Sequence, residues 1–449
     1  MWGSTSMRKP GAIAALLIFI EWHCRPINCE DFDTGLDVSS LFVSQNQSSG
    51  AQHSARWTDD IDPACSSKSQ TNVEGLSKRL NLVAPAYRSH MMSWTLLSTA
   101  VSLAQEIGCF SQDVLTNTIM ARREAVSGSV RLEWNRTLCT FIHLTDQNLS
   151  LRLRLEPQLP GTRCGNMINQ LHQSFSIDSF WESAIELAAH TGKARELLYC
   201  WRSGELGVQS PVLTTSWERF RRGLDRWNKQ HAPMSNERDL SLRRVCLRLD
   251  YFYIRLCGLS PAAHVFQGSS GDYQREPYMS MLSELSDDAV KTSVDLLNCV
   301  THDHPPSTLF KYVGVRYWLY IVCASLFLLK ATLRVEERLE DGHPHILLIR
   351  QAVRAVKENA PDDMHMSQRY ATLLDVYVNA ALRSPPSAVI SQDIFGLEFD
   401  DSSTSNCDHF QGSTLDQVSN IMYDFSFPNY LPDMVGLNDI FSFLPPGSD

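Results

Sequence analysis

The 449-residue sequence contains 12 cysteines but no C-x-x-C pair. Cys24 and Cys29 are the closest two, and no second pair completes a set of four metal ligands. The others stand singly along the chain, several inside apolar helical patterns such as those around Cys139, Cys246 and Cys257. This distribution does not suggest a disulfide scaffold. It favours small buried hydrophobes in a reducing compartment, with no cofactor or metal held by these residues.

Local catalytic motifs are also missing. The sequence has no G-x-S-x-G, G-x-G-x-x-G, G-x-x-x-x-G-K-[ST] or H-E-x-x-H. A catalyst assembled from distant residues stays open, but helical domains without a local motif are more often binding or regulatory modules. We therefore predict no catalytic residue and no enzyme activity.

Histidines gather in two short stretches, "THDHPP" and "GHPH". His302, Asp303 and His304 lie in the first, and His343 and His345 lie in the second. Two or three possible ligands do not define a metal site, and the neighbouring prolines favour stiffened loops before helices.

Positive charge is absent after Arg383. The chain has a net charge of −10, and all of it lies between Ser384 and Asp449, which hold ten acids and no Lys or Arg. The remaining 40 acids are balanced by 40 bases, so the body is neutral and offers no basic footprint for direct DNA binding. An acidic tail on a neutral body indicates two different roles.

Long hydrophobic runs are scarce. "AALLIFIEWHCRP", residues 14–26, resembles a secretory signal, but Glu21, Trp22 and His23 make a poor cleavage site, so we predict a buried helix ended by Arg25-Pro26. The run Tyr317–Leu329 covers about 20 Å as a helix, short of the roughly 30 Å of a bilayer core. We predict the buried centre of a helical protein and no membrane span.

The glycosylation triplets at Asn46, Asn135 and Asn148 keep open the alternative of a secreted or membrane-associated glycoprotein.

Apolar residues at helical spacing dominate the body. In "SWTLLSTAVSLAQEIGCF" two stripes form a wide apolar face that Gly108 stops, and "SFWESAIELAAHTG" runs from a capping box at Ser179 and Glu182 to a predicted end at Gly192. Further helices are predicted over 216–228, 242–259, 286–300, 308–332, 346–358 and 364–383. The segment Leu149–Leu155 alternates like a strand, and we interpret it as a distorted helix end or a lone extended segment.

Four tryptophans at helical spacing, Trp94, Trp217, Trp227 and Trp318, are interpreted as core. A ligand pocket lined by some of them stays open. The fold class is therefore all-α, with a domain over 11–383, a mobile polar loop over about 30–78 and a disordered tail over 384–449.

The tail alternates acids with bulky apolar residues. Such a segment lacks the apolar bulk to fold alone and can fold on a partner groove, as acidic-hydrophobic activation domains do. A purely solubilising tail has no need of seven Phe. The predicted contact residues are Phe425, Phe427, Leu431, Met434, Leu437, Ile440, Phe441, Phe443 and Leu444.

Four segments, in the same order, resemble the middle region of fungal zinc-cluster transcription factors. They are "ALLIFIEWHCRP", "SWTLLSTAVSLAQEIGCF", "LRRVCLRLDYFYIRLCGL" and "KYVGVRYWLYIVCASLFLLKA". The resemblance covers about residues 12–449 and is nearest to the activators of amino-acid catabolism and secondary metabolism. It implies an α-helical regulatory domain, a nuclear location and control of RNA polymerase II promoters.

The resemblance also implies an N-terminal cluster of six cysteines that holds two zinc ions and binds DNA. These 449 residues contain no such cluster, so we expect DNA and zinc contacts only through a missing N-terminal domain. Two explanations stay open: the gene model is truncated, or this chain is a cofactor-like member of the family without its own DNA contacts. The partners expected for this chain are a coactivator or transcription machinery at the tail, a second copy in a homodimer and a small-molecule effector.

Overall fold

The computed structural model describes most of the body of the chain and none of the tail. The described residues are 8–23, 88–110, 126–159, 179–202, 211–231, 242–268, 276–302, 309–310, 313–336, 339–361 and 365–383. Every regular element among them is a helix, which confirms the all-α prediction. The predicted mobile loop at 30–78 and the activation tail at 384–449 lie outside the described residues.

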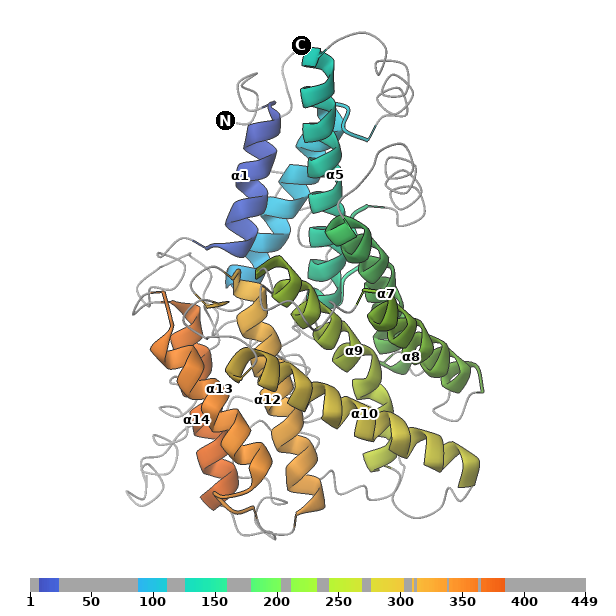
Figure 1. The fold of residues 1–449 in the computed structure, drawn as a ribbon, viewed down its shortest axis with the longest axis vertical. Coiled ribbons are helices and arrows are strands. Elements are labelled where there is room, and N and C mark those ends of the chain that lie inside the picture. The colour runs from blue at the N-terminus through green and yellow to red at the C-terminus, as the bar shows by residue number, and fades with distance from the viewer. Residues whose placement is uncertain are drawn as a thin grey trace, which may run out of the picture.

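The helices form an elongated body with two ends (Figure 1). One end holds α1, α5 and a helix over residues 88–106, and the other holds the remaining helices. The bounds are α1 Pro10–Glu21, α5 Val126–Leu153, α7 Ser179–Arg202, α8 Pro211–His231, α9 Leu242–Gly268, α10 Glu276–Thr301, α12 Val315–Val335, α13 Pro344–Glu358 and α14 Met366–Arg383.

A smaller hydrophobic core lies at the α1 end of the body, and we call it the upper core. Ile13, Leu17 and Ile20 of α1 are buried in it against residues of the 88–106 helix and α5. The prediction of a packed helix is thus confirmed, but its predicted end at Arg25-Pro26 is wrong. The helix ends at Glu21 because Trp22 takes an extended conformation.

The neighbouring helix 88–106 behaves as predicted. Leu97, Ala100 and Ala104 are fully buried, and Gly108 adopts φ 76° just beyond the last turn. The N–H of Cys109 then donates to the carbonyl of Ala104 at 2.9 Å, which satisfies a carbonyl that the helix end leaves open.

The strand-like segment Leu149–Leu155 is the end of a helix. α5 continues to Leu153, Arg154 takes φ 55°, and the N–H of Leu155 donates to the carbonyl of Ser150 at 3.0 Å. Leu149 packs in the upper core, whereas Leu151 packs in the larger core below it. The alternation arises because this helix end lies between two cores and buries residues on opposite sides.

The larger core, called here the lower core, is built from α7 to α14. The predicted apolar stripe of α8 is buried in it, as are most of the α9 positions. The predicted end of α7 at Gly192 is wrong, since the helix runs on to Arg202. Ala194, Leu197 and Leu198 are buried beyond the glycine, and their packing outweighs the roughly 1 kcal/mol that glycine costs inside a helix.

Helix α12 forms the centre of the lower core. It begins at Val315 rather than near residue 308, and its 21 residues make it long and apolar enough to cross a membrane by length and composition. The prediction that this helix is too short to cross a bilayer is therefore wrong. The interpretation as a buried core helix is confirmed, because 78% of the 18-residue apolar stretch of this helix is buried inside the fold.

Helix α5 also buries His143, which leads to a pH prediction. Burial lowers the pKa of His143 from 6.5 to about 4. A group with a lowered native pKa loses native stability as the pH falls from its unfolded value to its native value. We expect His143 to cost up to about 3 kcal/mol of unfolding free energy between pH 6.5 and 4.

Urea unfolding of the wild type and of His143→Gln across this range measures that loss. Burial raises the pKa of Asp146 to about 6, so this carboxyl stabilises the fold as the pH falls. Its contribution is common to both proteins and cancels in their difference. Equal pH slopes for the two proteins would contradict the prediction.

Candidate functional site

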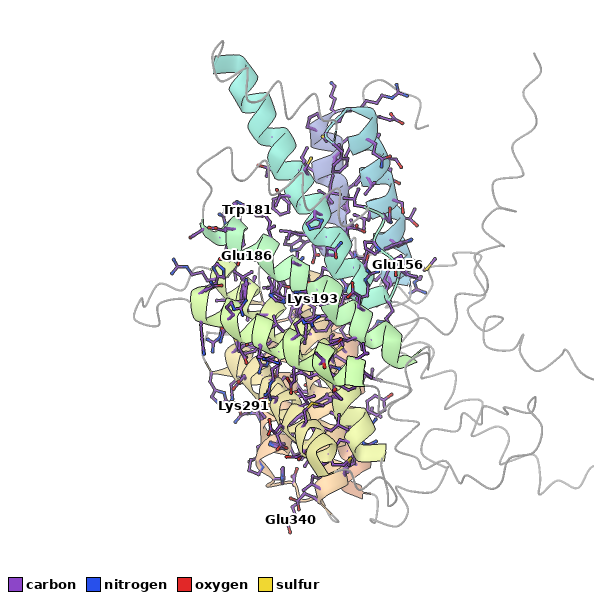
Figure 2. The ribbon with its side chains drawn as sticks, turned by 90° about the vertical axis from the view of Figure 1, so that its right-hand side faces the viewer. Glu156, Trp181, Glu186, Lys193, Lys291 and Glu340 are labelled. Atoms are coloured by element: carbon purple, nitrogen blue, oxygen red, sulfur yellow. The ribbon has the colours of Figure 1, made fainter. Side chains whose placement is uncertain are left out.

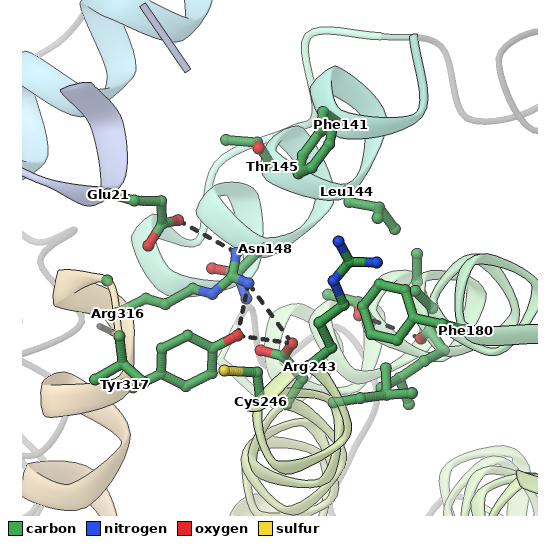
Figure 3. Close-up of a pocket in the computed structure, with 18 of the residues that line it drawn as sticks. Glu21, Phe141, Leu144, Thr145, Asn148, Phe180, Arg243, Cys246, Arg316 and Tyr317 are labelled. Carbon is green, nitrogen blue, oxygen red and sulfur yellow. Dashed lines mark hydrogen bonds and ion pairs between the residues drawn. The ribbon is translucent and has the colours of Figure 1, made fainter. Parts of the chain in front are cut away.

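A cavity of about 320 Å³ lies where the upper and lower cores meet. Its walls come from α5, α7 and α9, and it is completed by the end of α1 and the start of α12 (Figure 3). Segments separated by almost 300 residues therefore line one space.

The wall between α5 and α7 is apolar and aromatic. The rings of Phe141 and Trp181 meet edge to face with centroids 4.9 Å apart, and Phe180 lies beside Trp181 at 5.2 Å. Figure 2 shows Trp181 near the start of α7, where this helix passes α5. Phe141 is 44% exposed, so this wall is open to solvent at its edge, while Ala184 and Leu187 form its buried part.

The opposite side of the cavity is a polar network centred on Arg316. Its guanidinium contacts the carboxylates of Glu21 at 3.2 Å and Asp250 at 3.7 Å. The three side chains are 21%, 13% and 18% exposed, so the charges are largely removed from water. Arg316 of α12 thus forms ion pairs with both the end of α1 and α9.

Two tyrosines and an asparagine extend this network. The hydroxyls of Tyr320 and Tyr317 donate to Asp250 at 2.9 and 3.3 Å. The amide of Asn148 donates to the hydroxyl of Tyr320 at 2.5 Å, which brings α5 into the same network. Asn148 is buried, so its glycosylation triplet is not accessible in this fold.

Burial governs the protonation of these groups. It raises the pKa of Asp250, and the Arg316 cation offsets only part of that rise. For Arg316, burial opposes the charge, but Glu21 and Tyr317 outweigh it and hold the pKa well above the usual value. Burial also raises the pKa of Tyr320 well above 10, so its hydroxyl keeps the proton that it donates to Asp250.

Gly314 allows α1 and α12 to approach each other. It occupies the N-cap of α12, and a Cβ placed on it would lie 2.3 Å from Oε2 of Glu21. Any larger residue would displace the Glu21 carboxylate, so the network depends on glycine at this position.

Arg243 differs from the other charged residues of the cavity. It is exposed at the α9 wall, and its guanidinium lies 6.0 Å from the centre of the Phe180 ring. Figure 3 shows it reaching along the cavity beside Leu144 and Phe180. Within the described residues it has no ion-pair partner, which leaves a cation available to a ligand.

The sequence-predicted tryptophans do not line this cavity. Trp217, Trp227 and Trp318 are buried in the lower core, and Trp94 packs against the upper core. The tryptophans of the cavity are Trp22 and Trp181 instead. The sequence marks Glu21 as part of a poor cleavage site and gives no sign of a role for Arg316, because the pairing of these two residues joins distant segments.

The histidine clusters take local roles. Nδ1 of His343 accepts from the N–H of His345 at 3.2 Å and caps α13, while Nδ1 of His345 lies 2.9 Å from the hydroxyl of Thr332. His302 follows α10, with Nδ1 2.7 Å from the hydroxyl of Thr301. Asp303, His304 and the nine tail contact residues from Phe425 to Leu444 lie outside the described residues.

Fold and cavity together are those of an all-α protein with a largely buried polar junction between two cores. The chain is similar to the protein named "Transcription factor hmgR" of Aspergillus fumigatus, at 23% identity over 400 residues. The match covers 84% of this chain and 50% of the relative, so the chain spans about half the length of the curated relative. No family model and no solved structure matches the chain.

Proposed function

We propose that this chain is the regulatory and activating part of a fungal transcription regulator that acts on RNA polymerase II genes in the nucleus. The observation that carries the proposal is the 400-residue similarity to a protein named as a fungal transcription factor. The all-helical fold is consistent with it, as are the four sequence segments that occur in the same order as in fungal zinc-cluster transcription factors. The similarity also favours a regulator without enzyme activity.

The two parts of the chain have different roles in this proposal. The tail over 384–449 recruits a coactivator or the transcription machinery through its acidic-aromatic pattern. The helical body holds the cavity and receives a small-molecule effector, because the cavity joins the two cores that an effector would have to couple. In this proposal zinc and DNA are bound by the N-terminal six-cysteine cluster that the resemblance implies, and not by these 449 residues. The genes under control are those of amino-acid catabolism or secondary metabolism.

A reporter assay tests the tail directly. Residues 384–449 fused to an unrelated DNA-binding domain are expected to raise transcription at least about fivefold, since aromatic anchors carry most of the energy of such contacts. Replacing Phe425, Phe427, Phe441 and Phe443 by Ala is expected to abolish that rise.

Replacement of Phe395, Phe399 and Phe410, which lie earlier in the tail, is the matched control and is expected to have a smaller effect. A fusion that does not raise transcription, or one that is unaffected by the four Phe→Ala changes, would overturn the activation role.

Glycan analysis of the protein purified from a fungal host separates this proposal from the secreted alternative. A glycan on Asn46 or Asn135, or cleavage near Trp22, would favour the glycoprotein. Cleavage at Trp22 would also separate the buried face of α1 from the rest of the fold, since Ile13, Leu17 and Ile20 precede it.

A further inference from the structure

We propose that the cavity between the two cores binds a small organic carboxylate, with the carboxylate at Arg243 and an apolar body between α5 and α7. This inference rests on the proposed role of the cavity as an effector site and names the chemical class of the effector.

The shape and lining of the cavity define the body of the ligand. A volume of about 320 Å³ lies at the small end of the range for ligand pockets, about 300–1,000 Å³. Phe141, Phe180 and Trp181 offer ring faces and edges, and Ala184 and Leu187 close the buried side. These surfaces fit an aryl or medium-length alkyl group, which they would remove from water.

The charges define the head group and its orientation. Arg316 is committed to two carboxylates, so the polar network gives a ligand anion no unpaired cation and repels it with Glu21 and Asp250. Arg243 lies on the α9 wall beside the Phe180 ring, and it has no ion-pair partner among the described residues. A guanidinium binds a carboxylate through two parallel hydrogen bonds, so the anionic end of the ligand belongs at Arg243.

Calorimetric titration of the purified 449-residue chain tests this assignment. The probes are octanoate and phenylbutanoate, each compared with its neutral amide and with the amine of equal length. We expect each carboxylate to bind about tenfold more tightly than its amide, because hydrogen bonds between charged groups exceed neutral ones by about that factor. The amines are expected to bind most weakly.

Two variants test whether the preference for a carboxylate comes from Arg243 itself or from the general positive charge near the cavity. Arg243→Gln is expected to remove the preference for carboxylate over amide. Arg244→Gln changes the neighbouring exposed cation, which does not line the cavity, and is expected to keep the preference.

A third variant tests the apolar side of the cavity. Ala184→Phe fills that side and is expected to reduce the binding of every probe, while circular dichroism checks that the helices remain.

Equal binding of carboxylate and amide, an unchanged preference in Arg243→Gln, or no binding by any probe would overturn the assignment. These outcomes are independent of the reporter result, because the reporter contains only the tail. A tail that activates together with a cavity that ignores carboxylates would remove this inference and leave the proposed regulator intact.

Discussion

Replacing Arg316 by Met is expected to lower the unfolding free energy by about 2–4 kcal/mol. The change leaves Glu21 and Asp250 without the cation that compensates both, and an uncompensated carboxylate in a largely buried site costs several kcal/mol. The loss is kept below the usual 3–5 kcal/mol for a fully buried pair because the three side chains retain some contact with water. Urea unfolding followed by circular dichroism measures it.

A second change in the same background identifies the cause. Asp250→Asn removes one of the two uncompensated charges, so Arg316→Met with Asp250→Asn is expected to be more stable than Arg316→Met alone. The matched control is Arg350→Met, which breaks the exposed pair of Arg350 and Asp341 and is expected to cost less than about 1 kcal/mol. Equal losses for Arg316→Met and Arg350→Met would show that the network does not hold the two cores together.

The sequence predicts the helices of this protein better than it predicts their ends. Periodic apolar positions identify α8 and α9 because packing and local pattern agree there. They mislead at Gly192, where the local stop signal is overridden by buried residues further along α7, and at Leu149–Leu155, where one helix end serves two cores. In both places, contacts with distant helices decide the local structure.

The cavity could not be predicted for a related reason. Glu21 and Arg316 are separated by almost 300 residues and stand in two different segments of the family resemblance, so only the folded chain shows that they pair. Trp181 and Phe141 belong to different helices whose crossing brings their rings together. The residue types were visible in the sequence, but their meeting depends on how α1, α5, α7, α9 and α12 pack.

Replacing Gly258 by Ala is expected to destabilise the protein by about 3 kcal/mol, although alanine is the better helix former. Gly258 lies inside α9, where helix propensity alone predicts a gain of about 1 kcal/mol. A Cβ at this position would lie 2.2 Å from Cε1 of Phe220 and 2.4 Å from its Cζ. Phe220 is 1% exposed in the lower core, so its ring cannot move toward solvent, and overpacking of such a site costs more than propensity returns.

A second glycine and a second-site change make this test specific. A Cβ on Gly11 of α1 would meet nothing within 4 Å, so Gly11→Ala is expected to leave stability unchanged or raise it by up to about 1 kcal/mol. Phe220→Leu is expected to destabilise the wild type but to cost much less in the Gly258→Ala background, because the smaller side chain relieves the overlap. Strictly additive losses in the double variant, or a stabilised Gly258→Ala, would mean that α8 and α9 do not cross at this close contact.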